Sequence, residues 1–304
     1  MWATVVALAL SLSGCGSEEK VHPQPQGQPQ LNAPQWDGTF GPRPVKPNCH
    51  GNAQVPAPGD VICFTDDIDG PLQITIGGTP NSPITYSGTG KTKVRGIHAE
   101  TDNIVIQGFL SDGADSTGIW VAGDNVTVQD NTITRVMHTD QDLDAMRFFG
   151  NDVRLLHNWV HDLEGNNPEE SHVDCMQSFA TSQPGTTNAV LQGNRCEGIR
   201  AQCLMAEGPH VKDGSGQGVS QNWLFEGNYC DAHAKAQSVS LQDVQNVTIS
   251  RNTFAGKASK AIALGQNSTG VVVTEDNKLG PDYKRLVGFD DLSVKIGYRG
   301  PPAE

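Results

Sequence analysis

The sequence is poor in aromatic, charged and apolar residues, which make up 6%, 18% and 36% of its 304 positions. No apolar run reaches the roughly 18 residues that a membrane-spanning helix needs, so we expect no such helix in the mature chain. The charged fraction is too low for a coiled coil or a polyelectrolyte tail. Lysine and arginine number 21 against 34 aspartates and glutamates, a formal net charge of −13. Because neutralising phosphates requires cationic side chains, we expect no nucleic-acid partner.

What the sequence does contain favours β-structure. Its 34 glycines are accompanied by many asparagines and threonines. These residues suit turns and strands better than helix interiors. A large surface of turns around a thin core is therefore expected, in an all-β fold.

The first 14 residues read as a sorting signal. Residues 1–14, MWATVVALALSLSG, are largely apolar and end in small residues, as secretory signals do. The run Leu12-Ser13-Gly14-Cys15 resembles the lipobox of bacterial lipoproteins, which implies a lipid on Cys15 as the only membrane attachment. The alternative is an ordinary signal with an incidental cysteine. Both interpretations predict an exported protein, either a membrane-anchored lipoprotein or an extracellular one.

A linker is expected to follow the signal. Seven of the 18 prolines fall between Val21 and Pro47, mixed with glutamines. Such a segment favours extended conformations and buries little apolar area. We therefore divide the chain into a signal (1–14), a lipid-attachment cysteine and linker (15–47), and a folded domain (48–304).

An internal repeat predicts the fold of this domain. Short alternating strands recur with asparagine at one register, in segments such as NVTVQDNTI, NAVLQGNRC and NVTISRNTF, and each is followed by a second strand. A period of about 25 residues with short strands is typical of stacked β-coils. A β-sandwich is the alternative, but it would not return one asparagine to the same register repeatedly. The recurring asparagines are Asn131, Asn158, Asn194, Asn228, Asn252 and Asn277.

These repeats resemble the right-handed parallel β-helices of the pectin-lyase-like superfamily. The resemblance covers about Cys49 to Gly280 and implies a single solenoid of roughly eight to nine coils. Stacking predicts inward columns of apolar residues, one of them Met146, Met176, Leu204, Val239 and Ile262. The asparagines should lie at a bend, where their amides hydrogen-bond along the stack and tolerate unusual backbone angles. We expect a monomer.

The cysteines can be paired from this register. Stacked positions lie about 4.8 Å apart, which is within the range that a disulfide accepts. This predicts three disulfides, with the stacked pairs as free thiols the alternative. The predicted pairs are Cys49–Cys63, Cys175–Cys203 and Cys196–Cys230.

Long connections between strands suggest where a site lies. Segments 137–144, 161–174 and 208–221 are longer than their equivalents and belong to consecutive coils. Long loops in compact folds usually have a function, so we expect these three to wall a groove beside the sheet of second strands. This sheet includes the motif His172-x-Asp174-x-x-Gln177, which resembles a pattern in β-helix proteins of uncertain activity.

Charged and amide residues gather at this predicted groove. Strand alternation turns Arg147 and Gln177 outward in one column. The residues just before the second strands form another column. Together they supply the candidate catalytic residues His172, Asp174, Gln177, Arg147, Arg200 and Lys235, and the candidate substrate-binding residues Asp144, Gln202, Gln237 and Glu207.

The superfamily resemblance implies a polysaccharide partner and favours a lyase that eliminates across uronic-acid residues. Such lyases neutralise the substrate carboxylate, often with Ca²⁺, and take the C5 proton with a base, typically lysine or arginine. Lys235, Arg200 or His172 is the candidate base, and Arg147 could neutralise the carboxylate without a metal. The substrate is then acidic. The candidate Ca²⁺ ligands are Asp142, Asp144, Glu170 and Asp174.

Two other functions stay open. A glycoside hydrolase could use Asp144 and Asp174, one coil apart, as its carboxyl pair. A non-catalytic surface module for glycan binding or adhesion would need neither base nor acid. For each aspartate the competing interpretation is a capping residue that accepts backbone N–H groups. For His172 it is an ordinary surface histidine.

Overall fold

The computed structural model describes residues 31–137, 143–163, 173–180, 183–211 and 216–303. Within these ranges the strands form two sheets, one of 15 strands and one of nine. The 15-stranded sheet consists of β1 (Val61–Cys63), β3 (Ile84–Val94), β5 (Ile104–Asp112), β7 (Val126–Gln129), β8 (Thr132–Thr134), β10 (Arg154–Leu156), β11 (Trp159–His161), β13 (Val190–Gln192), β14 (Arg195–Ile199), β16 (Ser220–Glu226), β17 (Tyr229–Ala232), β19 (Val244–Ser250), β20 (Thr253–Phe254), β22 (Val272–Val273) and β23 (Lys278–Leu279). The nine-stranded sheet consists of β2 (Leu72–Ile74), β4 (Ile97–Glu100), β6 (Ile119–Ala122), β9 (Met146–Phe149), β12 (Met176–Phe179), β15 (Leu204–Glu207), β18 (Gln237–Gln242), β21 (Lys260–Leu264) and β24 (Arg285–Phe289).

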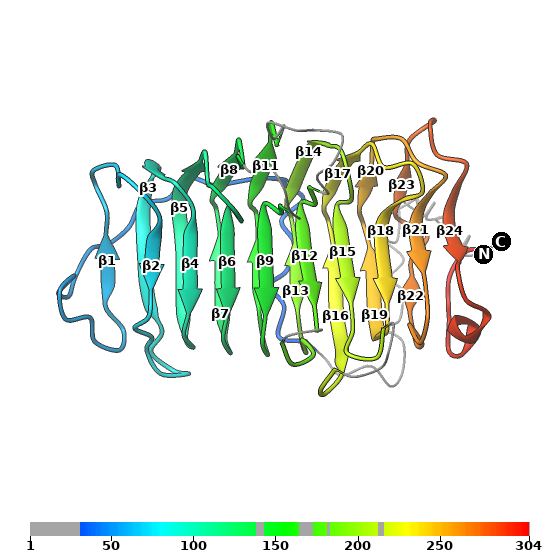
Figure 1. The fold of residues 1–304 in the computed structure, drawn as a ribbon, viewed down its shortest axis with the longest axis horizontal. Coiled ribbons are helices and arrows are strands. Elements are labelled where there is room, and N and C mark those ends of the chain that lie inside the picture. The colour runs from blue at the N-terminus through cyan, green and yellow to red at the C-terminus, as the bar shows by residue number, and fades with distance from the viewer. Residues whose placement is uncertain (1–30, 138–142, 164–172, 181–182, 212–215, 304) are drawn as a thin grey trace, which may run out of the picture.

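The chain winds into a single parallel β-helix, as the repeats predict. Each coil contributes one strand to the nine-stranded sheet, and successive coils pair in parallel, as β9 does with β6 and β12. Figure 1 shows these strands in one row along the molecule. A 3-10 helix, η1 (Leu292–Lys295), follows β24. The described residues contain no helix long and apolar enough to cross a membrane.

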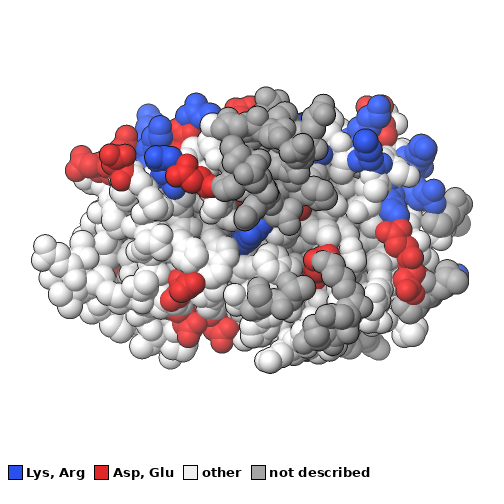
Figure 2. All heavy atoms as spheres, viewed as in Figure 1, with Lys and Arg blue, Asp and Glu red and all other residues white. Residues whose placement is uncertain are grey.

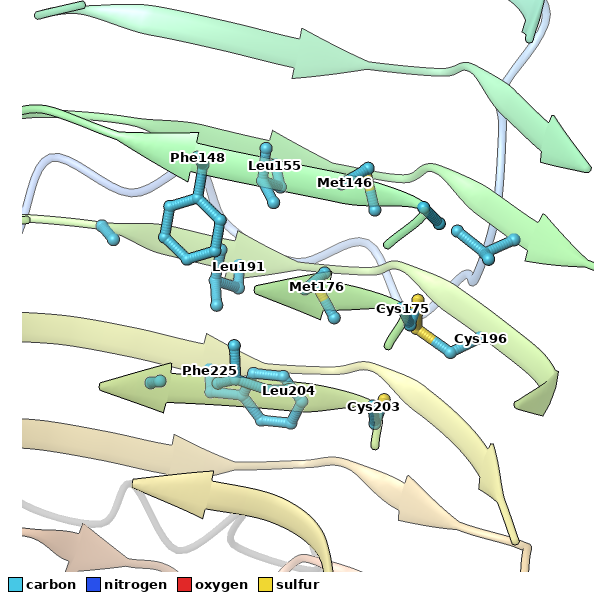
Figure 3. Packing of buried hydrophobic residues seen from close by; sticks show 14 of the residues in the cluster. Met146, Phe148, Leu155, Cys175, Met176, Leu191, Cys196, Cys203, Leu204 and Phe225 are labelled. Atoms are coloured by element: carbon cyan, nitrogen blue, oxygen red, sulfur yellow. A yellow bond between two sulfur atoms is a disulfide. The ribbon is translucent and has the colours of Figure 1, made fainter. Parts of the chain in front are cut away.

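The core is a set of stacked columns, and the predicted register is confirmed. Met146, Met176 and Leu204 are successive partners in the nine-stranded sheet, and Val239 and Ile262 continue the column. All five are 1% exposed or less. The first three lie one above the next in Figure 3. Because each coil supplies one thin layer, a small hydrophobic fraction is enough to fill the core.

The recurring asparagines form a buried ladder, which confirms their predicted role. Nδ2 of Asn158 donates to Oδ1 of Asn194 at 3.1 Å, and the same contact links every adjacent pair from Asn131 to Asn277. Each Oδ1 also accepts the backbone N–H of the preceding ladder asparagine, as between Asn158 and Asn194 at 3.0 Å. Each Nδ2 also donates a second hydrogen bond, to a strand carbonyl. For Asn194 this acceptor is the carbonyl of Leu155, at 2.8 Å.

The unusual backbone angle belongs to the residue before the ladder asparagine, and this corrects the prediction. Asp130, His157 and Arg251 have φ of 54°, 53° and 56°. Gly193 and Gly227 occupy the same position with φ of 68° and 59°. A left-handed residue here bends the chain between the two strands, so the asparagine itself needs no strained backbone.

The end of the expected linker packs against the β-helix and does not act as a free spacer. Nε2 of Gln192 donates to the carbonyl of Pro34 at 2.7 Å, and the N–H of Gly41 donates to that of Gly193 at 2.9 Å. Arg43 forms an ion pair with the buried Asp130 at 3.0 Å. The segment therefore lies along the bends just described, from the coil of β13 to that of β7.

Two glycines make room for rings at these bends, Gly227 for Trp36 of the segment and Gly193 for His157 of the β-helix. A Cβ on Gly227 would lie 2.4 Å from the Trp36 ring, and one on Gly193 would lie 2.7 Å from the His157 ring. Burial, and then the nearby Arg43 guanidinium, lower the pKa of His157. The neutral imidazole is therefore the form that the packed segment favours.

One predicted disulfide is confirmed, and two are wrong. Cys49 pairs with Cys63, but Cys175 pairs with Cys196 and Cys203 with Cys230, at Cα separations of 5.9 and 5.7 Å. Stacked cysteines in parallel strands point the same way, so their Cβ atoms do not converge as a disulfide requires. Cys175 and Cys196 instead come from the two sheets and face each other across the core (Figure 3).

The outer face of the 15-stranded sheet has a paired charge cluster. Arg195 donates two bonds of 2.9 Å to the carboxylate of Glu197, and the indole of Trp159 donates a third at 2.9 Å. The Arg195 guanidinium also lies 4.9 Å from the ring centre of Tyr229. The bond from Arg195 is the main cause that lowers the pKa of Glu197 to about 2.

This shift predicts a contribution to acid stability. A carboxylate with a lowered folded-state pKa stabilises the fold above its unfolded pKa, and that stability is lost as the pH falls from 4.5 toward 2. Glu197→Gln should therefore reduce the loss of thermal stability over this pH range. We expect a small effect because the Glu197 side chain is 36% exposed. Melting temperatures measured across this range test it, with Glu275→Gln as a control at an exposed carboxylate. The prediction is refuted if the melting temperatures of Glu197→Gln and of the unmodified protein fall equally as the pH is lowered.

Candidate functional site

The outer face of the nine-stranded sheet brings several predicted residues into one column. Gln177 is the strand partner of Arg147 on one side and of Met205 on the other, which confirms the predicted column. The column extends to the earlier coils through Trp120 and His98. Side chains here point away from the core because they alternate with the buried column of Met146 and Met176.

Contacts with Asp144 and Phe179 hold the Arg147 side chain in place. Its Nε donates to Oδ2 of Asp144 at 2.5 Å, and its guanidinium lies 5.6 Å from the ring centre of Phe179. The Asp144 side chain is fully buried and that of Arg147 is 18% exposed. The guanidinium is thus pre-positioned, but a carboxylate directly beneath it offsets its charge.

Asp144 and Asp174 each accept a backbone N–H from the next coil and so cap that coil. Oδ1 of Asp144 accepts the backbone N–H of Asp174 at 3.1 Å, and Oδ1 of Asp174 accepts that of Gln202 at 2.6 Å. Both residues are buried, with exposures of 0% and 3%. A hydrolase pair must present both carboxyl groups to a sugar. The observed bonds favour the capping role.

Two amide oxygens on this face are buried and unsatisfied. Among the described residues, Oε1 of Gln177 and Oε1 of Gln202 have no hydrogen-bond partner. Gln177 as a whole is 8% exposed. Because a buried acceptor without a donor is costly, such atoms mark positions where water or a ligand hydroxyl is expected to bind.

Arg200 and Lys235 lie in neighbouring turns at the edge of this face. Arg200 lies between β14 and β15 and Lys235 between β17 and β18, and these strands pair coil to coil. Both side chains are exposed, and within the described ranges neither forms an ion pair. Gln237 follows as the strand partner of Lys260. Glu207 is half-buried at the far end of β15, beside Phe179.

Several predicted residues lie outside the described ranges: Cys15, Asp142, Glu170 and His172. The described members of the predicted Ca²⁺ set are Asp144 and Asp174. Asp144 forms an ion pair with Arg147, and each aspartate uses an oxygen to bind a backbone N–H. No group of three His, Cys, Asp or Glu residues in the described chain could hold a metal. Because Asp144 is already paired with a guanidinium and each aspartate binds a backbone N–H, these two residues do not by themselves form a Ca²⁺ site.

A hollow of about 450 Å³ lies beside Arg147, and the sequence prediction missed it. It spans the first coils of the nine-stranded sheet, from β2 to β9. Extending the outward column of Arg147 to the three preceding coils would have found Trp120, His98 and Gln73. Arg95 and Asp115, which lie outside this column, also line the hollow.

Aromatic rings form the floor of this hollow and continue beyond it. The rings of His98 and Trp120 are stacked, with centres 4.1 Å apart and planes 5° apart. Trp120 then contacts Phe149 at 5.6 Å, and Phe149 contacts Phe179 at 5.0 Å. Figure 2 shows that Lys and Arg on this face lie chiefly along its upper edge.

Comparison with known proteins does not assign a family. No protein-family model matches the sequence, and the search of curated proteins finds no match. Among solved structures, an alginate lyase from Paenibacillus is 14% identical, with a TM-score of 0.28, over 77% of this chain and 91% of that one. A tailspike protein of an E. coli bacteriophage, solved with a pentasaccharide, is 10% identical, with a TM-score of 0.35, over 75% of this chain and 54% of the tailspike. A mannuronic-acid-specific polysaccharide lyase from the human gut microbiota is 12% identical, with a TM-score of 0.21, over 80% and 86% of the two chains.

Proposed function

We propose that this protein binds an extracellular acidic polysaccharide along the outer face of the nine-stranded sheet and eliminates across its uronic-acid residues. The observation that carries the proposal is a pair of exposed cations, Arg200 and Lys235, that form no ion pair with a described residue and lie beside a face lined with aromatic rings and amides. Export, and lipid attachment at Cys15, belong to the same proposal. The three disulfides are compatible with an oxidising compartment outside the cytoplasm.

The two cations can divide the work of the elimination. Arginine stays charged in proteins, so Arg200 is suited to pair with the substrate carboxylate and stabilise the charge that develops beside C5. Lysine can exist as a neutral amine, so Lys235 is suited to take the C5 proton. The C4–O bond then breaks, a C4–C5 double bond forms, and the departing oxygen takes up a proton. The aromatic rings would hold the chain in place.

The experiment is a panel of polygalacturonate, alginate and a glycosaminoglycan, followed by the ultraviolet absorbance of the unsaturated product. Lys235→Gln should lower the rate on the cleaved polymer by about 10²–10⁴-fold, the usual value of a general base. Arg200→Gln should also lower it, with no change in melting temperature. Lys278→Gln, at an exposed lysine of the other sheet, is the matched control.

The outcomes separate the competing functions. Saturable binding without unsaturated product would contradict elimination and favour a non-catalytic glycan-binding module. Product without the double bond would indicate hydrolysis. Loss of activity with a chelator would show that a cation takes part, with ligands that include residues outside the described ranges.

A further inference from the structure

We propose that the hollow between β2 and β9 is a subsite for an uncharged sugar residue, so that the polysaccharide bound on this face combines neutral sugars with uronic acids. The inference rests on the proposed function, but only on its binding part. It names the chemical class of one part of the ligand and places that part on the coils that precede those of Arg200 and Lys235.

The charges around the hollow are compensated. Arg95 lies 2.7 Å from Asp115, Arg147 lies 2.5 Å from Asp144, and His98 lies 3.2 Å from Glu100. Each of the two arginines thus has a carboxylate partner. A uronate placed here would be near guanidinium groups whose charge is already offset, and Asp115, 75% exposed, would repel it.

The remaining groups suit a ligand that is rich in hydroxyls. The register places Gln73 beside His98 and Arg147 beside Trp120, so an amide and a guanidinium lie on either side of the stacked rings. Gln73 and Ser116 can both donate and accept hydrogen bonds, whereas Asp115 only accepts and Arg95 and Arg147 only donate. This mixture satisfies hydroxyl groups, each of which donates and accepts.

The aromatic pair and the size of the hollow also suit a neutral sugar residue. Trp120 and His98 present rings that can pack against the apolar C–H groups of a sugar, and both are half-buried, so they need little reordering. The volume of about 450 Å³ lies within the usual range of small-ligand sites.

The hollow and the coils of Arg200 and Lys235 therefore differ in charge over a short distance. From β9, at the edge of the hollow, two strand spacings lead to β15, which is roughly 10 Å along the stack. The cations at Arg200 and Lys235 have no described carboxylate partner, whereas each cation at the hollow has one. One short oligosaccharide can contact both places, with a neutral residue in the hollow and a uronate beside Arg200 and Lys235.

The test is calorimetric titration of the full chain with xylo-, manno- and galacto-hexasaccharides and with hexagalacturonate. We expect one or more neutral oligosaccharides to bind, and Trp120→Ala to weaken that binding by roughly tenfold, as loss of a stacking ring should. His98→Ala is the second variant, in case Trp120→Ala alters the fold. Trp36→Ala, at a half-buried tryptophan that packs on the other sheet, is the matched control and should bind as the unmodified protein does.

Charge provides a second readout. Asp115→Asn should strengthen binding of hexagalacturonate and leave that of the neutral oligosaccharide unchanged. The inference is overturned if no neutral oligosaccharide binds, if its binding ignores both Trp120→Ala and His98→Ala, or if these variants weaken hexagalacturonate alone. Neutral binding without cleavage of any polyuronate would refute the proposed elimination and support the subsite. Cleavage of a polyuronate without binding of any neutral oligosaccharide would support the proposed elimination and refute the subsite.

Discussion

Replacing Asn194 with alanine will lower the free energy of unfolding by about 3–6 kcal/mol, since it leaves several buried polar groups without partners. Asn194 is fully buried in the middle of the asparagine ladder. Its Oδ1 accepts both the backbone N–H and the Nδ2 of Asn158, and its Nδ2 donates to Leu155 and Asn228. Water cannot reach these groups to replace the lost bonds.

Urea denaturation followed by circular dichroism measures this effect. The matched control is Gln129→Ala, which removes an amide of the same chemistry from the outer surface. Nε2 of Gln129 makes one half-exposed bond, of 2.8 Å, to Gln107, so its loss should cost no more than about 1 kcal/mol. Equal losses for the two variants would show that the ladder contributes no more than a surface amide pair.

Removing the Cys203–Cys230 disulfide has the second largest expected effect. The double variant Cys203→Ala, Cys230→Ala should lose about 3–4 kcal/mol of stability, because the disulfide closes a loop of this length in the unfolded chain. The separation of the two cysteines is 27 residues, and both are fully buried. Thermal and urea unfolding under non-reducing conditions measure the loss.

Free thiols in paired variants check the connectivity directly. In Cys203→Ala, Cys230→Ala the remaining Cys175 and Cys196 should stay bonded and should not react with a thiol reagent. In Cys175→Ala, Cys203→Ala both Cys196 and Cys230 lose their partners and should become reactive on unfolding. If instead Cys175 and Cys196 were reactive in the first variant and Cys196 and Cys230 stayed bonded in the second, the stacked cysteines would be the true pairs.

Residue patterns predicted the fold well because a β-helix repeats a local rule. Each coil must place an asparagine at the bend and apolar residues at alternate positions, so equivalent residues stack wherever the repeat is regular. Asn131 to Asn277 and the column from Met146 to Ile262 follow this rule. The outward direction of Arg147 and Gln177 follows from the same alternation.

The site was harder to predict because its contacts cross between coils and sheets. Nothing in the spacing of Asp144 and Arg147 shows that the carboxylate is buried beneath the guanidinium and offsets its charge. The stacking of His98 on Trp120 joins residues 22 positions apart in irregular early coils. Asp174 is in the predicted column, but its role as a cap depends on the backbone N–H of Gln202 in the next coil.

The low hydrophobic content, the abundance of turn residues and the repeated asparagines were enough to determine an all-β solenoid and the register of its core, because stacking depends only on the periodicity of the chain. Tertiary structure decided which cysteines pair, since a disulfide needs Cβ atoms that converge across the core and not merely positions that stack. It also decided that residues 34–43 pack along the bends, and that the cations beside the hollow are offset by carboxylates while Arg200 and Lys235 pair with no carboxylate of the described residues. Electrostatic balance depends on distances in three dimensions, which the order of residues along the chain does not specify.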